Sequence, residues 1–126
     1  MTTIISKRLD GQKLEKVVEI IRSVGFPVFD MELGRDEVAE NKSFFLYNEK
    51  GDIRPTERRN QYKQDFVLMF VSRDGKQIDE ISLIEPLRDA GLIFDQMDHS
   101  EGRLLDTDDK AEVLTFTFHY PVLIDR

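Results

Sequence analysis

The chain has 126 residues, of which 40% are hydrophobic and 34% charged, and its formal net charge is −7 at pH 7. This length suits a single domain, residues 1–126, with a sizeable core, and the composition is that of a globular rather than a disordered chain. The absence of cysteine excludes disulfides, thiolate catalysis and cysteine-based zinc sites. The N-terminal stretch lacks the apolar segment of a signal peptide, and no apolar run is long enough to span a bilayer, so we expect a cytoplasmic setting.

The first periodic segment is DGQKLEKVVEIIRSVG, residues 10–25. Its large apolar side chains recur at helical spacing and form one stripe, made of Leu14, Val17, Val18, Ile21 and Val24. Asp10 is a suitable N-cap, and Gly25 suits the position just beyond the last turn. The pattern predicts an amphipathic helix whose stripe packs on a sheet.

The next segments alternate as strands do. Residues 27–33 and 43–48 read as short strands, separated by a polar loop from Gly34 to Lys42. NEKGD, residues 48–52, has hairpin-turn chemistry, and Ile53 to Asn60 reads as a longer loop. The clearest strand is QYKQDFVLMFVSRDG, residues 61–75, with one face formed by Tyr62, Gln64, Phe66, Leu68 and Phe70.

A second helix is predicted over QIDEISLIEPLRDAGL, residues 77–92, with Gly91 as its stop. Its expected apolar stripe consists of Ile78, Ile81, Leu83, Ile84 and Leu87. Pro86 lies inside this pattern, where proline removes a hydrogen bond and bends or breaks a helix. Either Ser82 caps a shorter helix that has Pro86 in its first turn, or one kinked helix contains Pro86. We favour the kinked helix.

The last third resembles a long hairpin, in which residues 92–100 and 112–124 flank a polar tip around residues 106–109. In its second strand, Leu114, Phe116, Phe118 and Tyr120 share one face. The predicted fold class is therefore α+β, with an antiparallel (mixed) sheet of about five strands and two helices packed on one face.

The chain offers few candidates for chemistry. Asp95, Asp98, His99 and His119 are the side chains that could hold a divalent metal. Strand alternation sends Asp98 and His99 to opposite faces, so we interpret these four as solvated strand residues. The LDTDDK tip lacks the glycine and the distal glutamate of a calcium-binding EF-hand loop. With no phosphate-binding glycine motif or nucleophile motif either, we expect no catalytic residues, no metal and no cofactor.

The segment GDIRPTERRNQYK is basic within an acidic protein, because it carries Arg54, Arg58, Arg59 and Lys63. One interpretation is a solvated loop whose cations pair with neighbouring acids, at about 0–1 kcal/mol a pair. The other is a contact surface for a second subunit, since arginine is enriched at protein interfaces and an acidic copy of the same chain supplies carboxylates. A basic patch on an acidic body suits head-to-tail contacts, which close into rings.

The order of LEKVVEIIRSVGFPVF, YKQDFVLMFVSRDG, IDEISLIEPLRDAGLIF and EVLTFTFHYPVLI resembles the tail terminator, or tail-completion, proteins of long-tailed bacteriophages. These are also described as minor capsid or head–tail joining proteins. The resemblance extends from about Leu14 to Ile124 and rests on element order, size and hydrophobic pattern rather than on a diagnostic motif. Pro86 departs from the pattern expected for the second helix.

The resemblance implies a non-enzymatic structural protein of the virion, located at the tail–head junction and in the host cytoplasm during assembly. Such proteins form a ring, typically a hexamer, on the tail tube and offer a surface to the head connector. On this basis the basic segment is an interface with a neighbouring subunit or the tube rather than a sequence-specific nucleic-acid site. The alternatives are a neck or head-closure component and a small-molecule-binding or regulatory α+β module. The last would need a pocket lined by the aromatic residues Phe66, Phe70, Phe116 and Phe118, which are more typical of a core.

Overall fold

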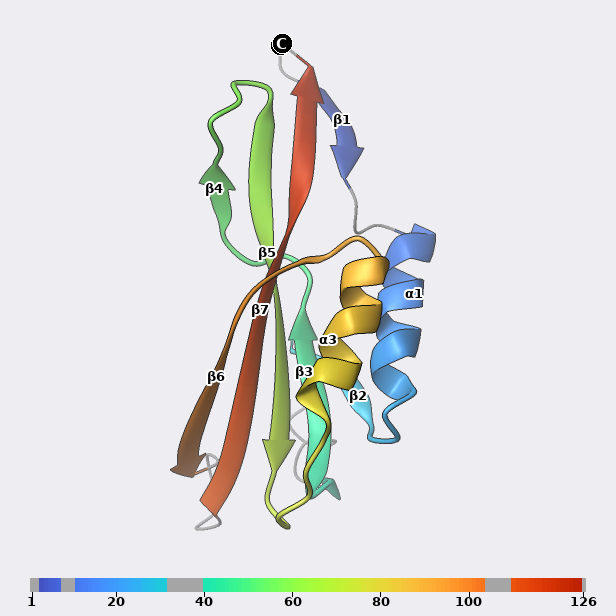
Figure 1. Ribbon diagram of the computed structural model, residues 1–126, viewed down its shortest axis with the longest axis vertical. Coiled ribbons are helices and arrows are strands. Elements are labelled where there is room, and N and C mark those ends of the chain that lie inside the picture. The colour runs from blue at the N-terminus through green and yellow to red at the C-terminus, as the bar shows by residue number, and fades with distance from the viewer. Residues whose placement is uncertain (1–2, 8–10, 32–39, 104–109, 126) are drawn as a thin grey trace.

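The computed structural model describes residues 3–7, 11–31, 40–103 and 110–125 (Figure 1). Two helices and seven strands follow one another along these ranges. In chain order they are β1 (Thr3–Lys7), α1 (Gly11–Arg22), β2 (Val28–Asp30), β3 (Ser43–Asn48), β4 (Ile53–Pro55), β5 (Gln61–Ser72), α3 (Glu80–Asp89), β6 (Ile93–Arg103) and β7 (Lys110–Asp125).

The strands form one mixed sheet around two long antiparallel neighbours, β5 and β7. The second partner of β7 is β6 along its first part and β1 along its last part. The second partner of β5 is β4 near its start and β3 near its end, and β2 lies beyond β3 in parallel orientation. The α+β class and the mixed sheet are therefore confirmed, whereas the expected number of about five strands is too low.

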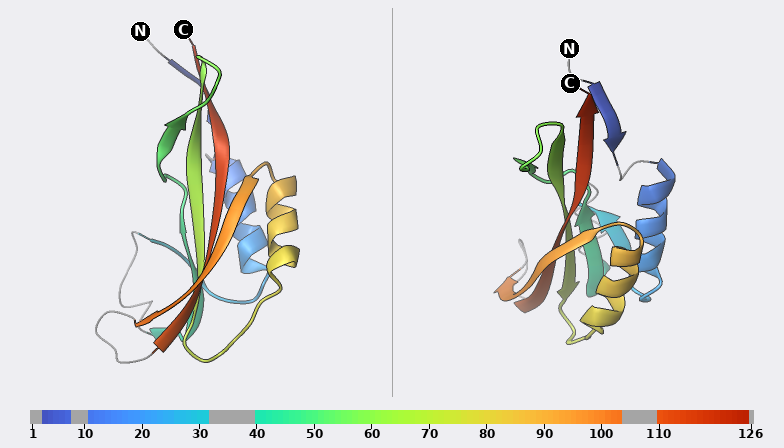
Figure 2. Two further views of the ribbon diagram at one scale, coloured as in Figure 1. Left: turned by 60° about the vertical axis from the view of Figure 1, so that its left-hand side comes forward. Right: turned by 45° about the horizontal axis from the view of Figure 1, so that its top comes forward.

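Both helices lie on the same face of the sheet, and they cover only part of its length (Figures 1 and 2). The core lies beneath them, where the alternating face of β5 and β7 is buried, as predicted. Its fully buried members include Val17, Ile21, Phe45, Phe66, Leu68, Leu87, Phe116, Phe118 and Tyr120. At the other end, β1, β4 and the adjoining ends of β5 and β7 extend beyond the helices (Figure 1). We call this helix-free part of the sheet the blade.

Helix α1 follows the prediction closely. Val17, Val18 and Ile21 of the expected stripe are buried, and Leu14 and Val24 pack against the core. Gly25 adopts a positive φ of 109° in the turn after the helix, where its N–H donates to the Arg22 carbonyl at 3.0 Å. The predicted cap Asp10, part of the loop from Gly34 to Lys42 and the polar tip at 106–109 lie outside the described residues.

Helix α3 differs from both alternatives in its start. Asp79, rather than Ser82, is the N-cap, and its carboxylate accepts hydrogen bonds from the Ser82 backbone N–H and hydroxyl. Pro86 lies inside this single helix, so the alternative of a shorter helix with Pro86 in its first turn is wrong. The stripe is rotated relative to the prediction, because Leu83, Ile84 and Leu87 are buried whereas Ile81 is 65% exposed.

Among the described residues, no helix is both long enough and apolar enough to cross a membrane.

Candidate interaction surface

The basic segment is a hairpin rather than a loop. Ile53–Pro55 pairs with residues 62–64 of β5, and Ser43–Asn48 pairs with residues 67–72. The chain from Ser43 to Pro55 therefore runs along most of β5, with an interruption at residues 49–52. The predicted hairpin turn at 48–52 is therefore wrong. Asn48 still makes a local bond there, because its side chain accepts from the Lys50 backbone N–H at 3.1 Å. The true turn is formed by residues 56–60, which we call the tip.

Gly51 allows the two strands to stay close at the interruption. Its N–H donates to the Asp65 carbonyl at 2.9 Å, and the Asp65 N–H donates to the Asp52 carbonyl at 2.9 Å. A Cβ added at Gly51 would lie 2.7 Å from that Asp65 carbonyl oxygen, closer than side chains pack in proteins. The glycine thus permits a close backbone approach instead of the turn conformation that was expected.

Arg54 and Lys63 lie opposite each other on β4 and β5 and do not belong to the tip. The Arg54 guanidinium forms an ion pair with Asp65 at 2.6 Å, and the Asp65 side chain is only 14% exposed. Like charges directly across a strand pair repel, so Asp65 offsets the repulsion between Arg54 and Lys63. Arg54 is therefore held within its own chain, as the solvated-loop interpretation supposes.

Arg58 and Arg59 differ from the other two cations. Both side chains are exposed, and neither forms an ion pair with a described residue. The tip that carries them is held by Thr56, whose hydroxyl donates to the Gln61 carbonyl at 2.9 Å and accepts from the Arg58 N–H at 3.2 Å. The tip lies at the end of the blade, away from both helices (Figure 1). The structure therefore presents, on this turn, two guanidinium groups that pair with no described residue.

The candidate metal ligands come together only in part. His119 Nδ1 lies 2.9 Å from both carboxylate oxygens of Asp95, on the sheet face away from the helices. A β-bulge between Phe94 and Gln96 places Asp95 beside His119, which strand alternation alone did not predict. Within the part of the chain that the structure describes, no three histidine, aspartate or glutamate side chains gather as a metal site would require.

The Asp95–His119 pair extends a row of charged residues across four strands. Asp65 lies opposite His119 on β5 and β7, and Arg54 pairs with Asp65 from β4. The row runs Arg54, Asp65, His119, Asp95, from β4 to β6. Because each carboxylate of the row already has a partner, Arg54 for Asp65 and the His119 ring for Asp95, the row links neighbouring strands rather than offering a charged site.

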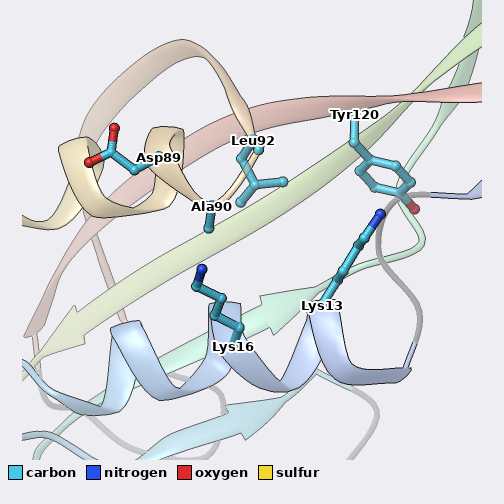
Figure 3. Close-up of a pocket in the computed structure, with 7 residues that line it drawn as sticks. Lys13, Lys16, Asp89, Ala90, Leu92 and Tyr120 are labelled. Carbon is cyan, nitrogen blue, oxygen red and sulfur yellow. The ribbon is translucent and has the colours of Figure 1, made fainter.

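The four aromatic residues that a ligand-binding module would need as a pocket lining lie in the core, as expected. All four side chains are at most 2% exposed and belong to one buried hydrophobic cluster: Phe66, Phe70, Phe116 and Phe118. A different pocket of about 270 Å³ lies between the start of α1 and the end of α3. Lys13 and Lys16 point into it from α1, and the Lys13 ammonium lies towards the Tyr120 hydroxyl (Figure 3). Burial raises the pKa of Tyr120 to about 12, and its hydroxyl donates to the Glu49 carbonyl at 2.6 Å.

Helix α1 also borders a groove on its opposite flank, which we call the acidic groove. Its volume is about 330 Å³, and it is lined by Leu14, Glu15, Val18, Glu19, Arg22 and Tyr47. Burial raises the pKa of Tyr47, and the carboxylates of Asp30 and Glu49 raise it further, against an opposing effect of Arg22. The groove was not predicted. Its sequence signal is the i, i+4 pair Glu15 and Glu19 beside the apolar stripe, but Tyr47 joins it only through the fold.

No protein-family model matches this sequence, and comparison with curated proteins finds no match.

Proposed function

We propose that the protein is a tail terminator of a long-tailed bacteriophage, which forms a ring on the end of the tail tube and stops its growth. The proposal rests on the resemblance in element order and pattern, and one structural observation supports it above others. The tip, at the end of the blade beyond the helices, carries Arg58 and Arg59, which are exposed and form no ion pair with a described residue; this suits contact with another protein. A projecting patch distinct from the rest of the surface favours head-to-tail association, the geometry of rings.

The proposed mechanism is geometric. A ring bound at the tube end covers the surface to which the next tube subunit would add, and its opposite side is available to the head connector. No bond is made or broken in this scheme. The net charge of −7 suits a ring through which DNA passes, because like charge limits adhesion to phosphate. On this proposal the protein acts in the virion, at the tail–head junction, after assembly in the host cytoplasm.

The test is tube growth in vitro with the tail-tube protein of the phage whose genome encodes this chain. Tube lengths are measured by negative-stain electron microscopy with and without the protein. We expect the protein to shorten the tubes and to sit as a ring on one end of each. Tubes of unchanged length and bare ends at a saturating protein concentration would refute the proposal.

A ligand-binding module is the second candidate, and the pocket at Lys13 and Lys16 is the observation that favours it. Two ammonium groups suit a small anion such as a carboxylate or phosphate, against the opposing charge of Asp89 in the same lining. A library of anionic metabolites, screened by thermal shift, separates the two functions. A saturable rise in melting temperature that is lost in K13A/K16A would support the module, whereas a terminator should show none.

A further inference from the structure

We propose that the tip of one copy docks into the acidic groove of the next copy, an inference that rests on the proposed ring function. In this contact, Arg58 and Arg59 of one copy meet Glu15 and Glu19 of its neighbour. The two patches lie on different parts of one chain, so the contact is head-to-tail and propagates from copy to copy.

The distribution of charge along α1 is the first observation. Lys13 and Lys16 lie on the flank that faces α3 (Figure 3), whereas Glu15 and Glu19 line the groove on the flank that faces β3. Both glutamates are exposed, and neither forms an ion pair with a described residue. By contrast, Glu85 on the outer surface of α3 is paired with Arg88 at 3.1 Å. The carboxylates of the groove are thus available to a partner's cation.

The shape and chemistry of the groove are the second observation. Leu14, Val18 and Tyr47 give it apolar walls between the two carboxylates and the sheet. The Tyr47 ring is held by a stacked contact with Phe66, with ring centroids 6.1 Å apart. An arginine has an apolar stem and a planar cation that stacks on aromatic rings and forks onto carboxylates. A groove of about 330 Å³ with these walls accommodates one such side chain.

Arg22 also lines the groove and opposes an incoming cation. It is outnumbered locally, because two glutamates line the groove and the Glu49 carboxylate also acts on the Tyr47 hydroxyl. The groove therefore retains an excess of negative charge. The tip cannot be the partner of its own groove, since it lies beyond the helices at the end of the blade, whereas the groove lies along α1 (Figure 1).

The test is a charge exchange measured by native mass spectrometry, with the tail-tube protein added where the free chain is monomeric. R58E/R59E changes only the tip, and E15K/E19K changes only the groove. We expect either variant to need more than about tenfold higher concentration to assemble than the natural chain. Mixed together, the two variants should assemble in a strict 1:1 alternation, and a chain carrying all four changes should assemble by itself.

The matched control is K13E/K16E, which changes the net charge by the same amount as R58E/R59E but on the other flank of α1. It should assemble like the natural chain. Circular dichroism of every variant separates loss of assembly from loss of fold.

The outcomes distinguish the docking contact from the proposed function. If the natural chain never assembles, with or without tubes, both the ring function and the docking contact are wrong. If it assembles and the tip and groove variants assemble equally well, only the docking contact is wrong. Docking is also overturned if R58E/R59E abolishes binding to duplex DNA at low salt while assembly is unchanged, since the tip would then be a phosphate contact.

Discussion

Gly51 offers the sharpest test of how the blade is attached to the rest of the sheet. Replacing it with alanine adds a Cβ that would lie 2.7 Å from the carbonyl oxygen and 2.9 Å from the Cβ of Asp65. These are main-chain and first side-chain atoms of a central strand, so they cannot rotate out of the way. The substitution must therefore move the strand segment 51–55 away from β5.

The cost follows from the bonds that this movement breaks. Two backbone hydrogen bonds, Gly51 to Asp65 and Asp65 to Asp52, each contribute about 1 kcal/mol. The ion pair between Arg54 and Asp65 adds about 0–1 kcal/mol, and the lower chain entropy of unfolded alanine returns about 0.5 kcal/mol. The free energy of unfolding should fall by about 2 kcal/mol, which lowers the melting temperature by about 8 °C for a domain of this size.

Urea denaturation gives the free energy, and hydrogen exchange locates the change. Exchange at the Gly51 and Asp65 amides should accelerate in G51A, whereas amides paired between β5 and β7 beneath the helices should keep their protection. Lys50→Ala, an exposed neighbour, is the control and should change stability by less than about 0.5 kcal/mol. A G51A variant with unaltered stability and unaltered Asp65 protection would show that the close approach is not required.

Three further predictions concern the helices and the core. Leu87→Ala should lower the free energy of unfolding by about 2–5 kcal/mol, because Leu87 is fully buried. Ile81→Ala on the same helix should lower it by less than about 0.5 kcal/mol, because Ile81 is 65% exposed. Equal effects of the two substitutions in urea denaturation would contradict the burial pattern. Hydrogen bonds from Ser82 lower the pKa of Asp79, so its stabilising effect is present above the unfolded-state pKa of about 3.9 and is lost as the pH falls through the lower folded-state pKa. Asp79→Asn should keep the N-cap hydrogen bond but remove this pH dependence of stability. Asp79→Ala should lose both the cap and the pH dependence. An acid denaturation curve of Asp79→Asn that matches that of the natural chain would refute this assignment. The pKa of Tyr120 is about 12 in the folded chain against 10 in the unfolded one, so stability should decline between pH 10 and 12, and this decline should be weaker in Tyr120→Phe. Thermal melts across that range, with tyrosinate absorbance as a check on ionisation, measure it.

The sequence predicts the fold correctly where the side-chain periodicity is long and unbroken. Strands β5 and β7 span 12 and 16 residues and alternate over most of their length, which is why their buried faces were predicted correctly. Strand β4 has only three residues, all exposed, and contains Pro55. A proline lacks the N–H of a ladder and is tolerated at a sheet edge, so residues 53–55 read as a loop although they are a strand.

The errors in α3 have a different origin. Helical spacing places Ile81 and Ile84 on one stripe, but spacing alone does not say which neighbouring apolar residues face the sheet. The structure buries Leu83, Ile84 and Leu87, and Ile81 lies to one side. The acidic groove was beyond prediction for a related reason, because Tyr47 reaches α1 only through the packing of β3 beneath that helix.

The basic residues differ in whether their replacement should affect the stability of the fold. Arg54 is paired with a largely buried carboxylate at the root of the blade, so its loss should affect stability first. Arg58 and Arg59 are exposed on a tip whose shape depends on Thr56, which bonds only to backbone atoms within the tip and at Gln61. Their replacement leaves those bonds in place, so R58E/R59E should unfold like the natural chain. Arg54→Glu should instead be destabilised, because it replaces the partner of Asp65 with a second carboxylate. A contact surface built from the tip alone can therefore be changed without cost to the fold, which makes assembly separately testable.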